Sequence, residues 1–236
     1  MFIMISKKTA KIIHMFPKPL LKKVVKFILD GYIKKYADIT VINKELLGSI
    51  KRPVIFISNH LSNSDGLILN KILGDGSVWY LAGVKLSHNE ITKLGLDIVK
   101  TVPINPNSPD ISAISKAVEL LKSGQSVCIF PEGTRSRSAS LIKGKRGIIL
   151  IAKLCRLPIV PIGIEGTERL MPINDEDMGK ERFFHADVRV TIGESFYIPE
   201  RSDNENRRKY EEKTIVIVMK KIASLLSPEY RGIYGE

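Results

Sequence analysis

Short apolar runs alternate with amphipathic stretches between residues 53 and 162, and this alternation most limits what the chain can fold into. The predicted strands are 54–57, 78–81, 98–104, 127–130 and 159–162, and the predicted helices are 67–73, 86–94, 111–121 and 148–154. Strands joined through helices lie parallel in one sheet with helices on both faces. The sequence therefore predicts an α/β fold with a largely parallel or mixed central sheet. Further strands are predicted at 39–42 and 188–192, and a last helix after the capping box Ser202-Asp203-Asn204-Glu205.

The first 35 residues carry most of the positive charge of the chain. They contain nine lysines and one aspartate, a net charge of +8 out of +12 for all 236 residues. Within residues 20–33 the apolar side chains recur on one side of a predicted helix and the lysines on the other. We therefore divide the chain into a basic amphipathic helical arm, residues 1–36, and a domain, residues 37–236. The arm either packs on the domain or lies on an anionic membrane surface, and its charge favours the membrane.

A histidine and an aspartate follow the predicted strand 54–57. With His60 in the turn and Asp65 in the first turn of the next helix, Asp65 can orient the imidazole and leave one ring nitrogen free to take a proton. This is the arrangement of a general base and its orienting carboxylate. A simpler alternative fits the same residues, because Ser62 and Asp65 have the spacing of a capping box in which Asp65 only caps a helix.

The loop after the predicted strand 127–130 has the composition of an anion site. Gly133 allows a close backbone approach, Arg135 offers a planar fork suited to two phosphate oxygens, and Glu132 is placed to hold that arginine. Hydroxyls come from Thr134 and Ser136, and Lys143 and Lys145 stand at the start of the next predicted helix. The alternative is a polar surface loop in which Glu132 and Arg135 only satisfy each other.

Taken together, these segments resemble the glycerophospholipid acyltransferases. Asn59-His60 with Asp65 is similar to the N-H-x4-D signature of that family, 130–136 to its F-P-E-G-T-R-S block, and 159–162 to its later apolar-proline block. The blocks occur in the family's order and cover about residues 54–167. In length the chain is most similar to the bacterial 1-acylglycerol-3-phosphate acyltransferases.

The resemblance implies transfer of an acyl group from acyl-CoA or acyl carrier protein to the sn-2 hydroxyl of 1-acylglycerol-3-phosphate, giving phosphatidic acid. It implies His60 as general base and Asp65 as its orienting partner, with nearby N–H groups stabilising the oxyanion. The predicted substrate-binding residues are Asn59, Glu132, Gly133, Thr134, Arg135, Ser136, Lys143 and Lys145. The expected partners are the lysophospholipid acceptor, the thioester donor and an anionic membrane surface. No bound cofactor or metal is expected.

One departure from the family concerns the acceptor. The family usually has an arginine just after the strand predicted here at 98–104, where this chain reads Pro106-Asn107. Arg135, Arg137, Lys143 or Lys145 could compensate, or the acceptor could be another lysolipid or an amino-lipid. Two other classes remain open: a lipid hydrolase using Ser62 or Ser64, and a basic nucleic-acid-binding protein. Against these, the chain has no G-x-S-x-G elbow and no aromatic stacking platform among its lysines.

Cysteine usage and hydropathy set the remaining expectations. Cys128 and Cys155 lie far apart in apolar surroundings, which indicates neither a disulfide framework nor a zinc site. No stretch approaches ~18 consecutive apolar residues, and the N-terminus lacks the features of a signal peptide. We therefore expect a peripheral or monotopic protein on the cytoplasmic face of a membrane.

Overall fold

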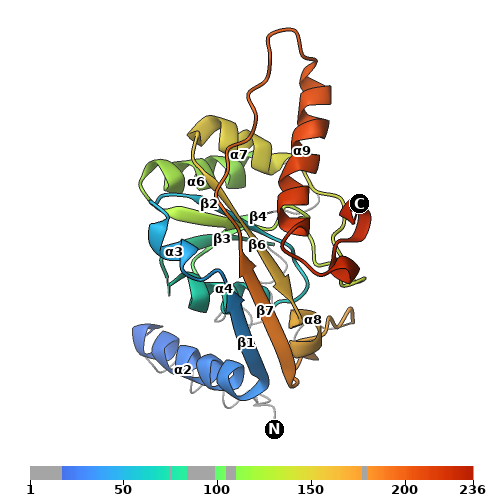
Figure 1. The fold of residues 1–236 in the computed structure, drawn as a ribbon. Coiled ribbons are helices and arrows are strands. Elements are labelled where there is room, and N and C mark those ends of the chain that lie inside the picture. The colour runs from blue at the N-terminus through green and yellow to red at the C-terminus, as the bar shows by residue number, and fades with distance from the viewer. Residues whose placement is uncertain (1–17, 75, 84–98, 105–109, 177–179, 236) are drawn as a thin grey trace.

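The computed structural model describes residues 18–74, 76–83, 99–104, 110–176 and 180–235. These residues form a seven-stranded sheet between two layers of helices (Figure 1). The strands are β1 (Ala37–Ile42), β2 (Ile55–Ser58), β3 (Val78–Gly83), β4 (Thr101–Ile104), β5 (Ser126–Ile129), β6 (Ile159–Glu165) and β7 (Ala186–Ile192). The helices are α2 (Lys18–Tyr36), α3 (Leu46–Ser49), α4 (Asp65–Leu73), α6 (Ile111–Lys122), α7 (Gly147–Cys155), α8 (Thr167–Leu170) and α9 (Arg207–Ala223), followed by the 3-10 turns η3 (Pro228–Tyr230) and η4 (Gly232–Tyr234).

The sheet is mixed, and its strand order is β1-β7-β6-β2-β5-β3-β4. Neighbouring strands are parallel except β6 and β7, which pair antiparallel, so β1 and β7 run opposite to the other five. Every residue of the central strands β2, β5 and β6 is buried, because helices cover both faces. The predicted α/β fold with a largely parallel or mixed sheet is confirmed.

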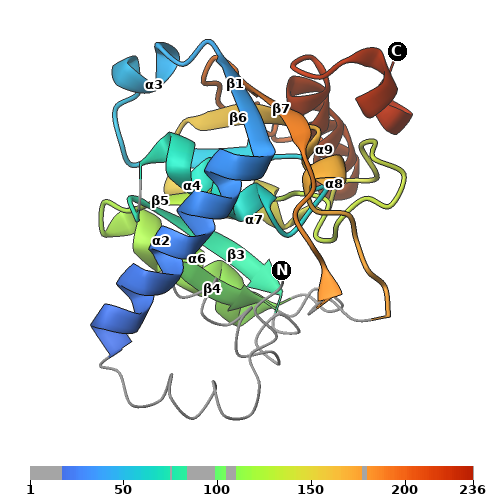
Figure 2. The same ribbon diagram turned by 90° about the horizontal axis from the view of Figure 1, so that it is seen from below.

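Two apolar cores separate the sheet from its helices. The helices α6, α7 and α9 pack on one face, where Ala117, Ile148 and Val218 are buried. On the other face α4 and α2 contribute the buried residues Ile68 and Ile33. Figure 2 shows α2 passing in front of α4 on this second face. The predicted arm helix is thus partly docked on the domain.

Most predicted elements are found, with differences in their ends. The predicted strand 98–104 is shorter as observed, β4 being Thr101–Ile104. The predicted capping box at 202–205 is wrong: α9 begins at Arg207, and its cap is Asn206, whose side chain accepts the N–H groups of Arg208 and Lys209. The predicted helix 86–94 and the Pro106-Asn107 loop lie outside the described residues.

Candidate active site

The side chains predicted to carry the chemistry meet at the carboxyl ends of β2 and β5, which are parallel neighbours. The turn after β2 holds His60, and the turn after β5 begins at Phe130. The imidazole of His60 stacks on the ring of Phe130 with centroids 4.1 Å apart. The backbone N–H of Ser136 donates to the carbonyl oxygen of His60 at 2.7 Å. The two turns therefore form one site at the edge where α/β proteins commonly bind ligands.

Asp65 holds the imidazole of His60. Its Oδ2 lies 2.7 Å from Nδ1 of His60 and also accepts the N–H groups of Leu61 at 2.7 Å and Ser62 at 2.9 Å. The Asp65 side chain is fully buried, whereas that of His60 is 19% exposed. Since a carboxylate only accepts, Nδ1 carries the proton and Nε2 is left to take one from a substrate. The structure brings this pair together as the sequence predicted, and their catalytic roles stay predictions.

Asp65 also shapes the start of α4, although the predicted capping box is incomplete. The Ser62 hydroxyl donates to the carbonyl oxygen of Met171 at 2.7 Å and accepts the N–H of Ser64 rather than that of Asp65. The carboxylate of Asp65 still accepts the Ser62 N–H, as it would in a box. The N-cap of α4 is Ser64, without a side-chain cap, so Asp65 fixes the turn and the imidazole but does not cap the helix.

Glu132 supports the backbone of the site instead of holding Arg135, so that prediction is wrong. It is buried, with Oε1 accepting the N–H of His60 at 2.8 Å and Oε2 accepting the N–H of Ile142 at 3.0 Å. Burial raises the pKa of the Glu132 carboxyl to about 7, which outweighs the lowering effect of its two backbone hydrogen bonds. Glu132 thus ties the His60 turn to the loop that carries Lys143 and Lys145.

The raised pKa of Glu132 predicts how stability changes with pH. A carboxyl whose pKa is higher folded than unfolded favours the protonated folded state, so its contribution is complete below pH 4.5 and is lost as pH rises to about 7. A shift of this size corresponds to ~3 kcal/mol. We expect the free energy of unfolding of the wild type to fall relative to Glu132→Gln between pH 5 and 7.5, measured by urea denaturation. Parallel pH curves for the two proteins would contradict this.

Arg135 pairs with a residue that the sequence did not single out. Its Nη1 lies 2.6 Å from Oε1 of Glu181, and the two side chains are 14% and 3% exposed. Arg137, the other arginine of this loop, is bound through Nε and Nη2 to the exposed carboxylate of Asp175. Glu181 was not predicted from the sequence, because it lies in no motif and is brought to the loop only by the tertiary fold.

The other predicted substrate-binding residues of these loops differ in exposure. Thr134, Lys143 and Lys145 are exposed, whereas Ser136 is buried and its hydroxyl donates to the carbonyl oxygen of Ser140 at 2.6 Å. Gly133 has a φ of +68°, and a Cβ there would come within 2.8 Å of the Lys145 amine. The positive φ favours glycine at this turn, whereas the flexible end of the Lys145 side chain could move away from a Cβ. Substrate contact by these residues stays a prediction.

Asn59 uses both ends of its side-chain amide inside the protein. Nδ2 donates to the carbonyl oxygen of Ile164 at 2.7 Å, and Oδ1 accepts the N–H of Ile164 at 2.8 Å. The side chain is buried. This geometry joins the end of β2 to β6 and supports a positioning role for Asn59 rather than the predicted contact with substrate.

Within the described ranges, no group of three or more His, Cys, Asp or Glu side chains is arranged to hold a metal ion. Over the same ranges, no helix is both long and apolar enough to cross a membrane.

Comparisons with known proteins show which family the chain resembles. The model of the family described as Acyltransferase matches residues 38–165, more than half of the chain. The chain is 31% identical over 165 residues to the chloroplastic 1-acyl-sn-glycerol-3-phosphate acyltransferase BAT2 of Brassica napus, a match covering 65% of this chain and 43% of that protein. It is 30% identical over 120 residues to the 1-acyl-sn-glycerol-3-phosphate acyltransferase of Bacillus subtilis, covering 51% and 55%. The matched segment thus spans about half the length of these relatives.

A solved structure shares the fold. The crystal structure of the 1-acyl-sn-glycerophosphate acyltransferase PlsC from Thermotoga maritima superposes with a TM-score of 0.58 at 24% identity, covering 84% of this chain and 78% of that one. The family match includes the turn of His60 and Asp65 and the loop of Glu132 and Arg135. The chain therefore belongs to the acyltransferase family.

Proposed function

We propose that this protein transfers a fatty acyl group from a thioester, acyl-CoA or acyl carrier protein, to the sn-2 hydroxyl of 1-acylglycerol-3-phosphate, giving phosphatidic acid. The observation that carries the proposal is the His60–Asp65 pair beside the loop of Arg135, in a chain that belongs to the acyltransferase family. The names of the relatives support the choice of acceptor. Arg135 would bind the acceptor's phosphate.

The proposed reaction needs no covalent enzyme intermediate. Nε2 of His60 removes the proton of the acceptor hydroxyl as the hydroxyl oxygen attacks the thioester carbonyl carbon. The tetrahedral intermediate then breaks its carbon–sulfur bond, and the imidazolium returns the proton to the leaving thiolate. The products are an ester and a free thiol. Asp65 stabilises the imidazolium that forms between the two proton transfers.

The oxyanion cannot use the N–H groups closest to His60 along the chain. The N–H of His60 itself is bound to Glu132, and those of Leu61 and Ser62 are bound to Asp65. In the described part of the chain, the structure gives no acceptor to the backbone N–H groups of Thr134 and Arg135. We therefore assign oxyanion stabilisation to this second turn in the proposed mechanism.

The positions of Ser62 and Ser64 do not support the alternative of a serine hydrolase. Ser62 and Ser64 are fully buried, and their hydroxyls donate to the Met171 carbonyl oxygen and to the Ser62 oxygen. A nucleophilic serine would need its hydroxyl directed at the imidazole. Incubation with acyl donor alone should therefore leave the intact mass of the protein unchanged, and an acyl adduct on either serine would favour the hydrolase.

The acceptor assay tests the proposed function directly. Purified protein is mixed with labelled acyl-CoA or acyl carrier protein and with 1-acylglycerol-3-phosphate, another lysophospholipid or an amino-lipid in turn. We expect labelled phosphatidic acid as the main product. Preference for an acceptor without phosphate would contradict the assignment while leaving acyl transfer in place.

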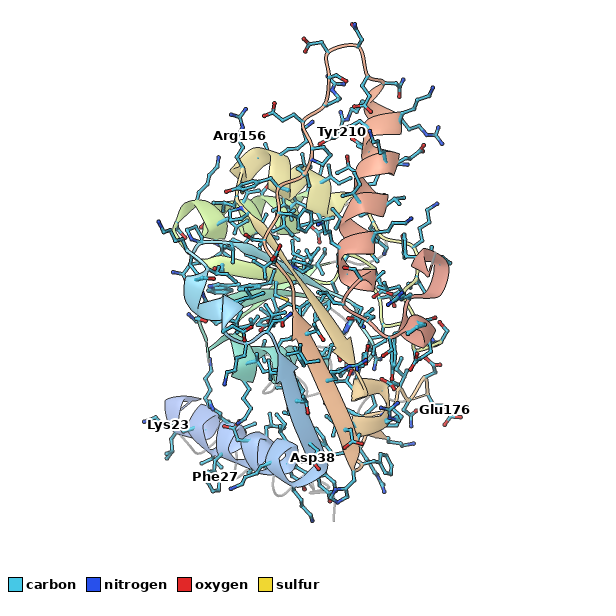
Figure 3. All side chains as sticks on the ribbon, viewed as in Figure 1. Lys23, Phe27, Asp38, Arg156, Glu176 and Tyr210 are labelled. Atoms are coloured by element: carbon cyan, nitrogen blue, oxygen red, sulfur yellow. The ribbon has the colours of Figure 1, made fainter. Side chains whose placement is uncertain are left out.

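The outer side of α2 is suited to contact the membrane in which the acceptor resides. Leu20, Val24 and Phe27 are exposed and lie at helical spacing on one side, and Phe27 is 79% exposed. Figure 3 shows Phe27 and Lys23 pointing away from the rest of the molecule. Ile33, in contrast, is buried against the domain. We propose that this outer apolar stripe enters the acyl boundary while the flanking lysines face anionic headgroups.

This proposal predicts weaker vesicle binding when the stripe is made polar. Replacing Leu20, Val24 and Phe27 together by serine should lower affinity for anionic vesicles by roughly tenfold or more, because each apolar side chain contributes through buried area. Sedimentation with liposomes measures the effect. Ile111→Ser is the matched control, since Ile111 is 73% exposed on α6. Equal binding by the triple variant and the control would contradict a membrane role for α2.

A further inference from the structure

Glu181 connects the two loops of the active site, although it lies outside the segment that matches the family, residues 38–165. Its Oε1 lies 2.6 Å from Nη1 of Arg135, and its Oε2 accepts a hydrogen bond from Nδ2 of Asn63 at 2.7 Å. The backbone N–H of Asn174 donates to the same Oε1 at 3.2 Å. One buried carboxylate thus contacts the His60–Asp65 turn and the arginine of the following loop.

The burial of Glu181 requires these partners. A carboxylate removed from water costs several kcal/mol unless it is paired and hydrogen-bonded. The side chain of Glu181 is only 3% exposed, so its charge is stabilised by the ion pair with Arg135. The same ion pair fixes the position of the Arg135 guanidinium. The pair is therefore a defined part of the site, unlike the exposed pair of Arg137 and Asp175.

The way in which Arg135 is held leaves most N–H donors of its guanidinium without a partner among the described residues. Among the described residues, Glu181 is its hydrogen-bond partner through Nη1 alone. A guanidinium carries five N–H donors, so Nε and Nη2 can still form a two-point contact with an anion. In Arg137, by contrast, the Nε–Nη2 side of the guanidinium is already bound to Asp175. Of these two arginines, Arg135 is the one whose Nε–Nη2 side has no hydrogen-bond partner among the described residues.

The same network fixes Arg135 relative to the proposed base. Glu181 binds Asn63, which lies in the turn between His60 and Asp65, while the N–H of Ser136 binds the carbonyl oxygen of His60. Two independent links, one through side chains and one through backbone, therefore join the imidazole to the arginine loop. In an acceptor that carries both groups, this sets the separation between the phosphate and the hydroxyl that reacts.

We propose that Glu181 is a positioning residue that holds the Arg135 fork for the acceptor's phosphate and so places the acceptor's sn-2 hydroxyl at His60. The inference rests on the proposed function, because it takes the anion to be the phosphate of the acceptor. Glu181 does not touch the reacting atoms. Its removal should loosen Arg135 in the ground state and the transition state alike, which changes KM rather than kcat.

Two variants of Glu181 separate the effect of its hydrogen bonds from the effect of its negative charge. Glu181→Gln keeps an acceptor for Arg135 and, once the amide of Asn63 turns, a hydrogen bond to Asn63. Glu181→Ala removes both. We expect Glu181→Ala to raise the KM for 1-acylglycerol-3-phosphate roughly tenfold, the size of one charge-assisted hydrogen bond. The kcat and the KM for acyl donor should stay within about twofold, and Glu181→Gln should restore the acceptor's KM.

Glu165→Ala is a matched control for loss of a buried carboxylate. Glu165 binds Arg189 and accepts the N–H of Ser227 at 2.6 Å, so it too pairs with an arginine and a backbone N–H, but its partners are neither Arg135 nor Asn63. The control should leave the acceptor's KM unchanged. If Glu181→Ala instead lowers kcat and leaves the acceptor's KM as it is, Glu181 is only structural and the inference is overturned.

A binding measurement tests the role of Glu181 independently of the proposed acyl transfer. Titration calorimetry with sn-glycerol 3-phosphate reports on the anion site without acyl transfer. The inference is supported if Glu181→Ala binds sn-glycerol 3-phosphate roughly tenfold more weakly and Glu181→Gln binds it with wild-type affinity. This holds even if the wild type transfers no acyl group to 1-acylglycerol-3-phosphate. Equal binding by wild type and Glu181→Ala, or no binding by the wild type, overturns it even if acyl transfer is observed.

Discussion

Replacing His60 by alanine is expected to lower kcat for acyl transfer by ~10²–10⁴-fold, the usual contribution of a general base. The fold should persist, because alanine keeps the hydrogen bonds that the backbone of His60 makes to neighbouring segments. Its N–H donates to Glu132 and its carbonyl oxygen accepts from Ser136, and alanine keeps both. The lost contacts are the hydrogen bond from Nδ1 to Asp65 and the stacking of the imidazole on Phe130.

His185 provides the matched control. It is exposed and packs its ring 4.8 Å from that of Tyr36, at the end of α2. His185→Ala should keep the wild-type kcat, while His60→Ala loses it at the same free energy of unfolding within about 1 kcal/mol. Circular dichroism and urea denaturation verify folding. A folded His60→Ala protein with wild-type kcat would exclude His60 as the base.

The sequence predicted the parts of the site that depend on local spacing. His60 and Asp65 are five residues apart, so their meeting requires only that a turn precede α4 at that point. The apolar runs predicted the central strands because a strand covered on both faces is apolar along its whole length. These features rest on contacts between residues close together in the chain or on burial alone.

The remaining parts depend on which segments the fold brings together. Nothing local distinguishes Glu132 as a partner of Arg135 from Glu132 as an acceptor of the His60 N–H, and the choice is made when β2 and β5 become neighbours. The amide of Asn59 is occupied for the same reason, because β6 lies on the other side of β2. The antiparallel pairing of β7 with β6 is equally non-local.

Glu181 is the extreme case of this dependence. It comes from the segment before β7, and it binds Asn63 across 118 residues of sequence. A lone glutamate in a polar stretch carries no periodicity or motif that would mark it. Only the packing of that segment against the two loops gives it a buried position with an arginine partner.

Asp65→Asn is expected to lower kcat by ~10²–10⁴-fold, with kcat measured by the same acyl-transfer assay. Oδ2 of Asp65 accepts from the imidazole and from two backbone N–H groups. If the asparagine oxygen takes that place, the geometry survives, but the negative charge that stabilises the imidazolium is gone. If the asparagine NH2 group occupies the position of Oδ2 instead, it faces the N–H of Nδ1, so two donors meet and His60 is driven to the wrong tautomer. Either arrangement weakens the base.

The same substitution should also cost stability, and a second aspartate separates the two effects. Oδ1 of Asp65 is buried without a hydrogen-bond partner in the described chain, so an NH2 group there leaves a buried donor unpaired, at a cost of ~1–3 kcal/mol. Asp110 caps α6 by accepting the N–H of Ala113 at 3.0 Å. Asp110→Asn should lose at most about 1 kcal/mol and keep the wild-type kcat. If Asp65→Asn behaves like Asp110→Asn, losing stability at unchanged kcat, then Asp65 only stabilises the turn before α4 and is not the partner of the base.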